Sequence, residues 1–174
     1  MERTAGEGRY ARVEREQRWV LAALPDGLDR PVSIVDLYIR ATRLRLRRME
    51  DGATVVYKLG QKVRPDPQSP ETVHLTNMYL SEHEYATLAH LGGAEITKTR
   101  WRWSPAPRPL AVDVFGGALT GLVLAEVELD PDEPPRPPPP SALADVTDDD
   151  RFCGGTLALT TATEMNQLLG PLRR

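Results

Sequence analysis

Two widely separated segments of the sequence carry the same acidic pattern, a glutamate at every second position. Glu14 and Glu16 lie in RVEREQRWVL (12–21), and Glu126 and Glu128 lie in LTGLVLAEVEL (119–129). Residues i and i+2 of a β-strand share one face, about 6.5 to 7 Å apart, so two such pairs on neighbouring strands bring four carboxylates together. Close carboxylates repel each other, and a hard divalent cation relieves the repulsion. The pattern therefore indicates a site for Mg²⁺ or Mn²⁺.

Two other segments, TRLRLRRM (42–49) and ITKTRWRW (96–103), carry basic side chains at the same spacing. Guanidinium groups match phosphate oxygens two at a time, and a lysine adds a compact point charge. A polyanion bound to metal on one side and to these groups on the other satisfies both patterns. The basic side chains are Arg43, Arg45, Arg47, Lys98, Arg100 and Arg102.

Strict alternation over these lengths is typical of strands, and it leaves open which face is buried. Each strand taken alone fits an ordinary sandwich with its charges in solvent. The set as a whole favours a closed barrel whose charged faces turn inward and whose apolar outer faces are covered by helices. Arg102 fits the interior and a solvated strand end about equally well, and Trp101 and Trp103 are expected in the core.

Composition excludes several other classes of protein. The chain of 174 residues has 22 Lys and Arg against 25 Asp and Glu, a net charge of -3 that gives no support for nucleic-acid binding. The single cysteine, Cys153, excludes a disulfide within the chain and a cysteine-built zinc site. No apolar run approaches the roughly 20 residues of a membrane span, and the first residues have no signal-peptide core. We therefore expect a cytoplasmic protein with no membrane partner.

The remaining segments complete a mainly β (α+β) protein in one domain, 1–174. Further strands are predicted at 54–59, 73–80 and 110–117, with a turn at Glu50-Asp51-Gly52 that makes a hairpin. Helices are predicted at 81–93, from the capping-box spacing of Ser81 and Glu84, and at 160–170, where Gly170 is the expected stop. Segment 32–40 fits helix or strand, and the proline-rich segment 131–140 is expected to be a stiff surface loop.

These motifs together resemble the triphosphate tunnel metalloenzymes, the CYTH superfamily, in their small bacterial form. The hallmark of that family is Glu-x-Glu-x-Lys on the first strand, and this chain has Glu14-Arg15-Glu16-Gln17-Arg18 there, with arginine in the last position. The resemblance continues, in the expected order, through RLRLRR (43–48), Lys98-Thr99-Arg100, VDVFGGALTGLVLAEVEL (112–129), Asp145-Val146-Thr147 and Asp150-Arg151-Phe152.

The resemblance implies a closed eight-stranded antiparallel β-barrel tunnel with a few covering helices, which binds a triphosphate together with Mg²⁺ or Mn²⁺. Carried over by position, the implied metal ligands are Glu14, Glu16, Asp113, Glu126 and Glu128. The implied phosphate ligands are Arg43, Arg45, Arg47, Lys58, Lys98, Arg100 and Arg102. The implied catalytic residues are Glu14, Glu16, Arg18 and Lys58.

The function that this implies is hydrolysis of inorganic triphosphate by a metal-dependent triphosphatase, with a triphosphate-containing small molecule as the partner. Other activities of the same fold stay open: a class IV adenylate cyclase, a thiamine triphosphatase or a nucleoside triphosphatase. A non-catalytic triphosphate- or nucleotide-binding module is the alternative from a different class. Arg18 and the acid-free strand 73–80 are the features that favour it. The oligomeric state stays open, with a homodimer as one alternative.

Overall fold

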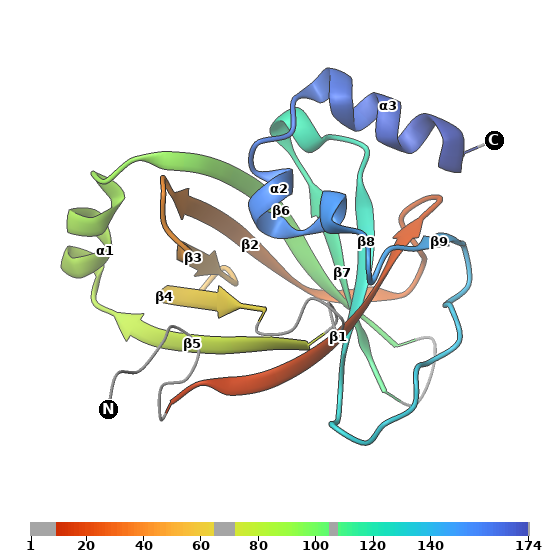
Figure 1. Cartoon of the computed structure of the whole chain (residues 1–174), viewed down its shortest axis with the longest axis horizontal. Coiled ribbons are helices and arrows are strands. Elements are labelled where there is room, and N and C mark those ends of the chain that lie inside the picture. Colours follow the sequence, from red (N-terminus) through yellow and green to blue (C-terminus); the bar gives the residue numbers. More distant parts are fainter. Residues whose placement is uncertain (1–9, 65–71, 105–107, 174) are drawn as a thin grey trace.

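The computed structural model describes residues 10–64, 72–104 and 108–173, and about half of them lie in β-strands (Figure 1). The strands are β1 Arg12–Leu21, β2 Leu28–Ile39, β3 Leu44–Glu50, β4 Val55–Val63, β5 Thr72–Leu80, β6 Gly93–Trp103, β7 Leu110–Phe115, β8 Val123–Leu129 and β9 Ala142–Asp145. The helices are α1 Glu82–Ala89, α2 Gly154–Leu157 and α3 Ala162–Leu172, with 3-10 turns η1 Gly117–Leu119 and η2 Asp150–Phe152.

Eight of these strands close into an antiparallel barrel, which confirms the predicted fold class. The order is β5-β4-β3-β2-β6-β7-β8-β1-β9, and the barrel closes because the first half of β1 also pairs with β5, with Glu14 opposite Val73. β9 is an additional strand, paired with the end of β1 that β5 does not reach. In this circular order, β2 and β3 lie diametrically across the barrel from β8 and β1.

An apolar cluster closes one end of the barrel. It joins inward-facing residues of the strands, such as Val20 and Leu124, to Phe152 of η2, Leu157 of α2 and Met165 of α3. Burial of this surface holds the C-terminal segment across the barrel end, and Figure 1 shows α2 and α3 gathered there, apart from α1. We call residues 146–157, which include η2 and α2, the cap.

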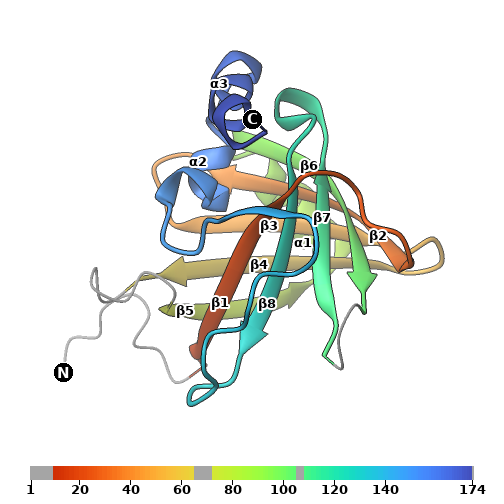
Figure 2. The ribbon, with the colours of Figure 1, turned by 90° about the vertical axis from the view of Figure 1, so that its right-hand side faces the viewer.

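A second apolar cluster lies on the outer face of β1, β7 and β8 and includes Trp19, Val112 and Trp103. Trp101 packs against it, so the prediction that both tryptophans belong to the core is confirmed. The proline-rich segment runs over this side of the barrel (Figure 2), and Arg15 donates to the carbonyl oxygens of residues 130, 131 and 133. Within 131–140, every third residue, beginning at 133, is less exposed than its neighbours. That period matches a polyproline II segment with one side against the protein.

The helices follow their sequence signals with two corrections. The helix predicted at 81–93 ends at Ala89, and Gly93 already begins β6. Both capping boxes form, from Ser81 to Glu84 and from Thr161 to Glu164. The prediction that α3 stops at Gly170 is wrong, because the helix continues through Pro171 to Leu172. A glycine stop needs positive φ, which Gly170 does not adopt, and Leu172 packs against the apolar cluster of the cap end.

The undecided segment 32–40 is strand throughout its first eight residues, within β2. The predicted hairpin between β3 and β4 forms, with Gly52 at a φ of 88°. Among the described helices, none combines the length and the apolar character that a membrane crossing requires.

Candidate functional site

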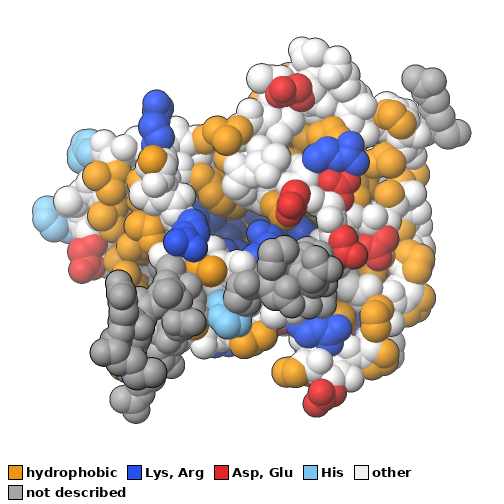
Figure 3. Space-filling model, in the orientation of Figure 1, with side chains coloured by type: hydrophobic (Ala, Val, Ile, Leu, Met, Phe, Trp, Pro, Cys, Tyr) orange, Lys and Arg blue, Asp and Glu red, His pale blue; other side chains and the backbone are white. Residues whose placement is uncertain are grey.

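The interior of the barrel holds a cavity of about 680 Å³. Its lining includes ten basic side chains and five acidic ones, an excess of positive charge inside a chain whose net charge is -3. Figure 3 shows lysine and arginine side chains gathered in a hollow at the centre of this face. The charged lining residues are Glu14, Glu16, Arg18, Asp36, Arg43, Arg45, Arg47, Lys58, Lys62, Arg64, Lys98, Arg100, Arg108, Glu126 and Glu128. The alternating charged faces therefore turn inward, and we call this space the lumen.

The acidic side of the lumen is formed by β1 and β8. Glu16 lies directly opposite Glu128 in the antiparallel register, a placement in which two like charges destabilise a sheet. Burial raises the pKa of Glu14 above its ordinary value, and the carboxylates of Glu16 and Glu128 add to that rise against the lowering effect of Lys62. These carboxylates thus form one electrostatic cluster that requires cations.

Protein cations satisfy these carboxylates. Lys62 Nζ lies 2.8 Å from Glu16 Oε1 and 3.7 Å from Glu14 Oε2. Although burial opposes it, this ammonium lowers the pKa of Glu16 to about 2. Glu128 pairs with Arg12 at 3.2 Å, and Glu126 with Arg100 Nη2 at 2.6 Å.

The basic side across from β1 and β8 is organised by a buried aspartate, Asp36 of β2. Arg47 donates to it from Nε and Nη2 at 2.6 and 2.7 Å, and Arg45 Nε lies 3.6 Å away. Burial opposes ionisation of Asp36, yet its hydrogen bond with Arg47 lowers the pKa of the carboxyl below its ordinary value. The aspartate therefore stays ionised and fixes both guanidinium groups at the lumen wall.

A second buried aspartate, Asp113 of β7, does the same for β6. It accepts from Arg100 Nε and Nη2 at 2.6 and 2.7 Å and from Lys98 Nζ in a shorter contact. Burial lowers the pKa of Lys98, whereas Asp113 and Glu126 raise that of Arg100 despite its burial. Asp113 is 0% exposed and is not among the lining residues. Asp113, expected from the resemblance as a metal ligand, therefore lies behind Lys98 and Arg100 and pairs with both of them.

Arg18, the arginine of the first-strand motif, holds the cap. Its Nη1 donates to the carbonyl oxygen of Phe152 at 2.9 Å and its Nη2 to that of Thr147 at 3.0 Å. The Arg18 amide donates to Thr147 Oγ1, and both terminal nitrogens approach Cys153 Sγ at 3.6 to 3.8 Å. Arg18 is 5% exposed and lines the lumen, and its donors are directed at the cap. Its main observed contacts are structural, and they differ from those expected of a catalytic group.

Arg102 does not line the lumen. It lies on the same strand face as Lys98 and Arg100, but at the exposed end of β6, opposite Asp29 and Ala111. The register of β2 shifts beside it, between Asp29 and Val32, which marks the end of the regular barrel wall. Of the two alternatives for Arg102, the structure has the solvated strand end.

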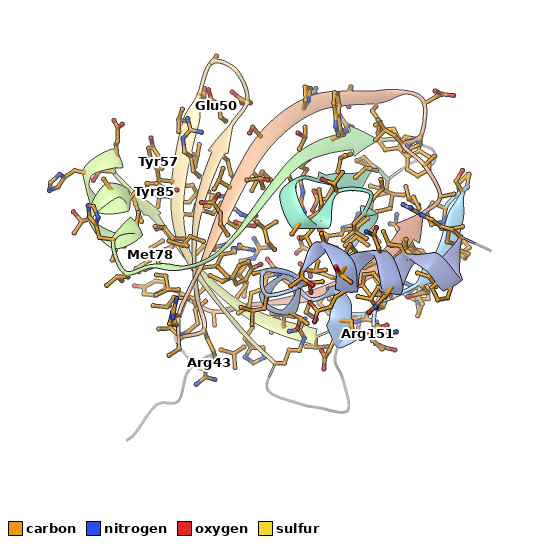
Figure 4. All side chains as sticks on the ribbon, turned by 90° about the horizontal axis from the view of Figure 1, so that it is seen from above. Arg43, Glu50, Tyr57, Met78, Tyr85 and Arg151 are labelled. Atoms are coloured by element: carbon orange, nitrogen blue, oxygen red, sulfur yellow. The ribbon has the colours of Figure 1, made fainter. Side chains whose placement is uncertain are left out.

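Two of the expected phosphate ligands, Lys58 and Arg43, face the lumen without an ion-pair partner among the described residues. Lys58 Nζ lies 4.9 Å from the ring centroid of Tyr79. Arg43 lies at the exposed rim of the barrel (Figure 4). On the outer side of the same strands, the rings of Tyr57 and Tyr85 lie 4.7 Å apart and join β4 to α1 (Figure 4).

Several lumen residues escaped sequence reasoning. The strand predicted at 54–59 continues to Val63, which brings Lys62 onto the same face as Lys58. That signal was present in the sequence, because alternation continues past Gly60. Asp36 lies in the segment that fitted helix or strand. Arg64, two residues after Lys62, continues the same alternation just beyond β4. Arg108 has no such pattern, and only the closed barrel places it in the lumen.

The donor set of the acidic side fits a hard divalent cation, because it consists of carboxylate oxygens and because the charges of Glu16 and Glu128 raise the pKa of Glu14. In the described part of the chain, however, no three carboxylate, thiol or imidazole groups already surround one point as metal ligands. The carboxylates are turned toward Lys62, Arg12 and Arg100.

Comparison with solved structures supports the barrel fold described above. No family model and no curated protein matches the chain. A crystal structure described as the inorganic triphosphatase NE1496 matches with a TM-score of 0.56 and 26% identity, over 84% of this chain and 95% of that one. Another structure of NE1496, described as a hypothetical protein, matches with a TM-score of 0.58 and 25% identity, over 85% of this chain and 99% of that one. The PH1819 protein from Pyrococcus horikoshii OT3 matches with a TM-score of 0.51 and 15% identity, over 92% of this chain and 94% of that one. This likeness shows the fold alone.

A closed eight-stranded antiparallel barrel with an acidic side and basic sides around one lumen defines the triphosphate tunnel class of proteins. The two NE1496 structures share this architecture over almost their whole length. The chain has the fold of the CYTH, or triphosphate tunnel, superfamily.

Proposed function

We propose that this protein is a divalent-metal-dependent triphosphatase that hydrolyses inorganic triphosphate in the lumen. The observation that carries the proposal is the composition of the lining, in which ten basic groups exceed five acidic ones around one cavity inside the barrel. Fixed positive charges in such a space attract a compact polyanion far more strongly than they do in open water. The name of the neighbour NE1496, an inorganic triphosphatase, supports the same substrate.

In this proposal the chain's own residues divide the work between two sides of the lumen. Arg45, Arg47, Lys98 and Arg100, held by their buried aspartates, bind phosphate oxygens, and Lys58 and Arg43 extend that surface toward the rim. Glu14, Glu16, Glu126 and Glu128 would hold Mg²⁺ or Mn²⁺. The metal, when bound, would withdraw charge from the transferring phosphoryl group and lower the pKa of a coordinated water.

A nucleoside triphosphate is the second candidate, and Tyr79 favours it. This side chain is 73% exposed and lies over Lys58, on the strand face that turns toward the lumen. An exposed aromatic ring beside a phosphate-binding ammonium offers a stacking surface for a base.

The test is to measure phosphate release from tripolyphosphate, ATP and thiamine triphosphate with Mg²⁺, with Mn²⁺ and with EDTA. We expect tripolyphosphate to be the best substrate and EDTA to abolish turnover. Glu14→Gln and Glu126→Gln should each lower turnover about 100-fold, whereas Glu82→Gln, an exposed glutamate of α1, should leave it unchanged. Tight binding of tripolyphosphate without hydrolysis would refute the enzymatic proposal and favour a binding module.

A further inference from the structure

The carboxylates of Glu14 and Glu16 are neutralised from a strand that does not adjoin theirs. Lys62 belongs to β4, and β5 lies between β4 and β1 in the barrel wall. Its side chain nevertheless extends through the lumen to within 2.8 Å of Glu16 and 3.7 Å of Glu14. One ammonium group therefore bridges both acidic side chains of the first-strand motif.

The chemistry of this cation suits a temporary partner. A lysine is a compact charge on a flexible stem, with none of the planar, two-pronged fit of an arginine. The side chain of Lys62 is 32% exposed, so its release to solvent or to another ligand costs little. Arg100, the partner of Glu126, differs because the buried Asp113 also holds its guanidinium in two hydrogen bonds.

We propose that Lys62 is the resident counter-ion of Glu14 and Glu16, and that a divalent cation competes with it for these carboxylates. Binding of the divalent cation then frees the ammonium for an anionic ligand in the same lumen. This inference rests on the proposed function only in taking a divalent metal as the competing cation.

Two opposite effects follow when the ammonium is removed. A divalent cation binds more tightly, because its carboxylates are no longer occupied, and a phosphate ligand binds more weakly, because it loses a cation. A lysine that only binds phosphate would give the second effect without the first. The sign of the change in metal affinity therefore distinguishes a counter-ion from an ordinary phosphate ligand.

The experiment is a Mn²⁺ titration of the full chain at neutral pH without any phosphate, followed by the electron paramagnetic resonance signal of free Mn²⁺. If Lys62 occupies the carboxylates for about nine-tenths of the time, Lys62→Met strengthens Mn²⁺ binding about tenfold. Lys58→Met is the matched control, because it removes the same charge from the same lumen but its ammonium lies over Tyr79 and not on a carboxylate. We expect it to change Mn²⁺ affinity less than threefold, as general screening of a distant charge implies.

A second measurement follows the released ammonium. At saturating Mn²⁺, calorimetry should show orthophosphate binding about tenfold more weakly to Lys62→Met than to the wild type, as expected for a lost charged hydrogen bond. Lys62→Gln is the substitute if the Met variant does not fold, and a thermal melt of each variant establishes that it does.

Equal or weaker Mn²⁺ binding by Lys62→Met relative to Lys58→Met overturns the proposal. The outcome is independent of the proposed function. Wild-type hydrolysis of tripolyphosphate combined with unchanged Mn²⁺ affinity rejects the counter-ion and keeps the triphosphatase. Tighter Mn²⁺ binding by Lys62→Met, combined with a wild type that hydrolyses no triphosphate, keeps the counter-ion and rejects the triphosphatase.

Discussion

The substitution Asp113→Asn tests whether a buried aspartate holds the β6 cations in place. Asp113 is fully buried and accepts two hydrogen bonds from Arg100 and a third from Lys98. Asparagine has the same shape but no charge, so the substitution leaves two buried cations without their shared anion. The change removes an electrostatic partner and creates no cavity.

The expected loss of stability follows from these contacts. Removing one partner of a buried ion pair costs about 3 to 5 kcal/mol. Two features favour the lower end: Arg100 keeps its contact with Glu126, and Lys98 can give up its proton, because burial already lowers its pKa. We therefore expect the free energy of unfolding to fall by about 3 kcal/mol, which for a chain of this size lowers the melting midpoint by roughly 6 to 12 °C.

Urea denaturation of the wild type and of the variant measures this loss, with Glu50→Gln as the matched control. Glu50 pairs with Arg48 at 2.6 Å, as short as the Arg100 contact, but the two side chains are 39% and 35% exposed. A pair of this kind contributes about 0 to 1 kcal/mol. If Asp113→Asn costs no more than Glu50→Gln, burial does not make the Asp113 pairing important and the reasoning is refuted.

The same variant has a signature in the pH dependence of stability. Despite its burial, Lys98 and Arg100 hold the pKa of Asp113 below its ordinary value. A depressed pKa contributes stability that is fully present above the unfolded-state pKa of about 3.9 and is lost as the pH falls toward the folded-state value. The wild type should therefore lose this contribution below about pH 4, and the variant, which lacks the carboxyl, should show a correspondingly shallower acid slope.

Two further predictions concern the lumen and the cap. Arg100→Ala should lower kcat/KM for tripolyphosphate about 10- to 100-fold through loss of a charged hydrogen bond. Arg102→Ala, at the exposed strand end, should change it less than twofold. Equal effects of the two substitutions in steady-state assays would contradict the placement of these arginines. Gly154→Ala would place a Cβ against the Tyr38 hydroxyl oxygen and should cost about 1 to 3 kcal/mol in thermal unfolding, whereas Gly155→Ala, with open space around its Cβ, should be tolerated. Similar melting points would show that the cap does not pack on Tyr38.

The strands and the inward charge pattern were predictable because period-two alternation is a local property of the sequence. Arg45 and Arg47, like Glu126 and Glu128, differ from their neighbours within a few residues, and the alternation alone predicts that they share a face. The errors lay where local signals compete with packing. Gly170 and Pro171 predict a helix end, but the contact of Leu172 with the apolar cluster of the cap end outweighs them.

The sequence by itself determined which side chains are charged, which face of each strand they share and that acidic and basic faces are both present. Only the tertiary structure decided their partners: Asp113 under Lys98 and Arg100, Arg18 on the cap, and Lys62 on Glu14 and Glu16. The reason is that a charged group's partner depends on strand order, register and barrel closure. These bring together residues as far apart as 16 and 62, or 18 and 152, and no short-range pattern records such distances.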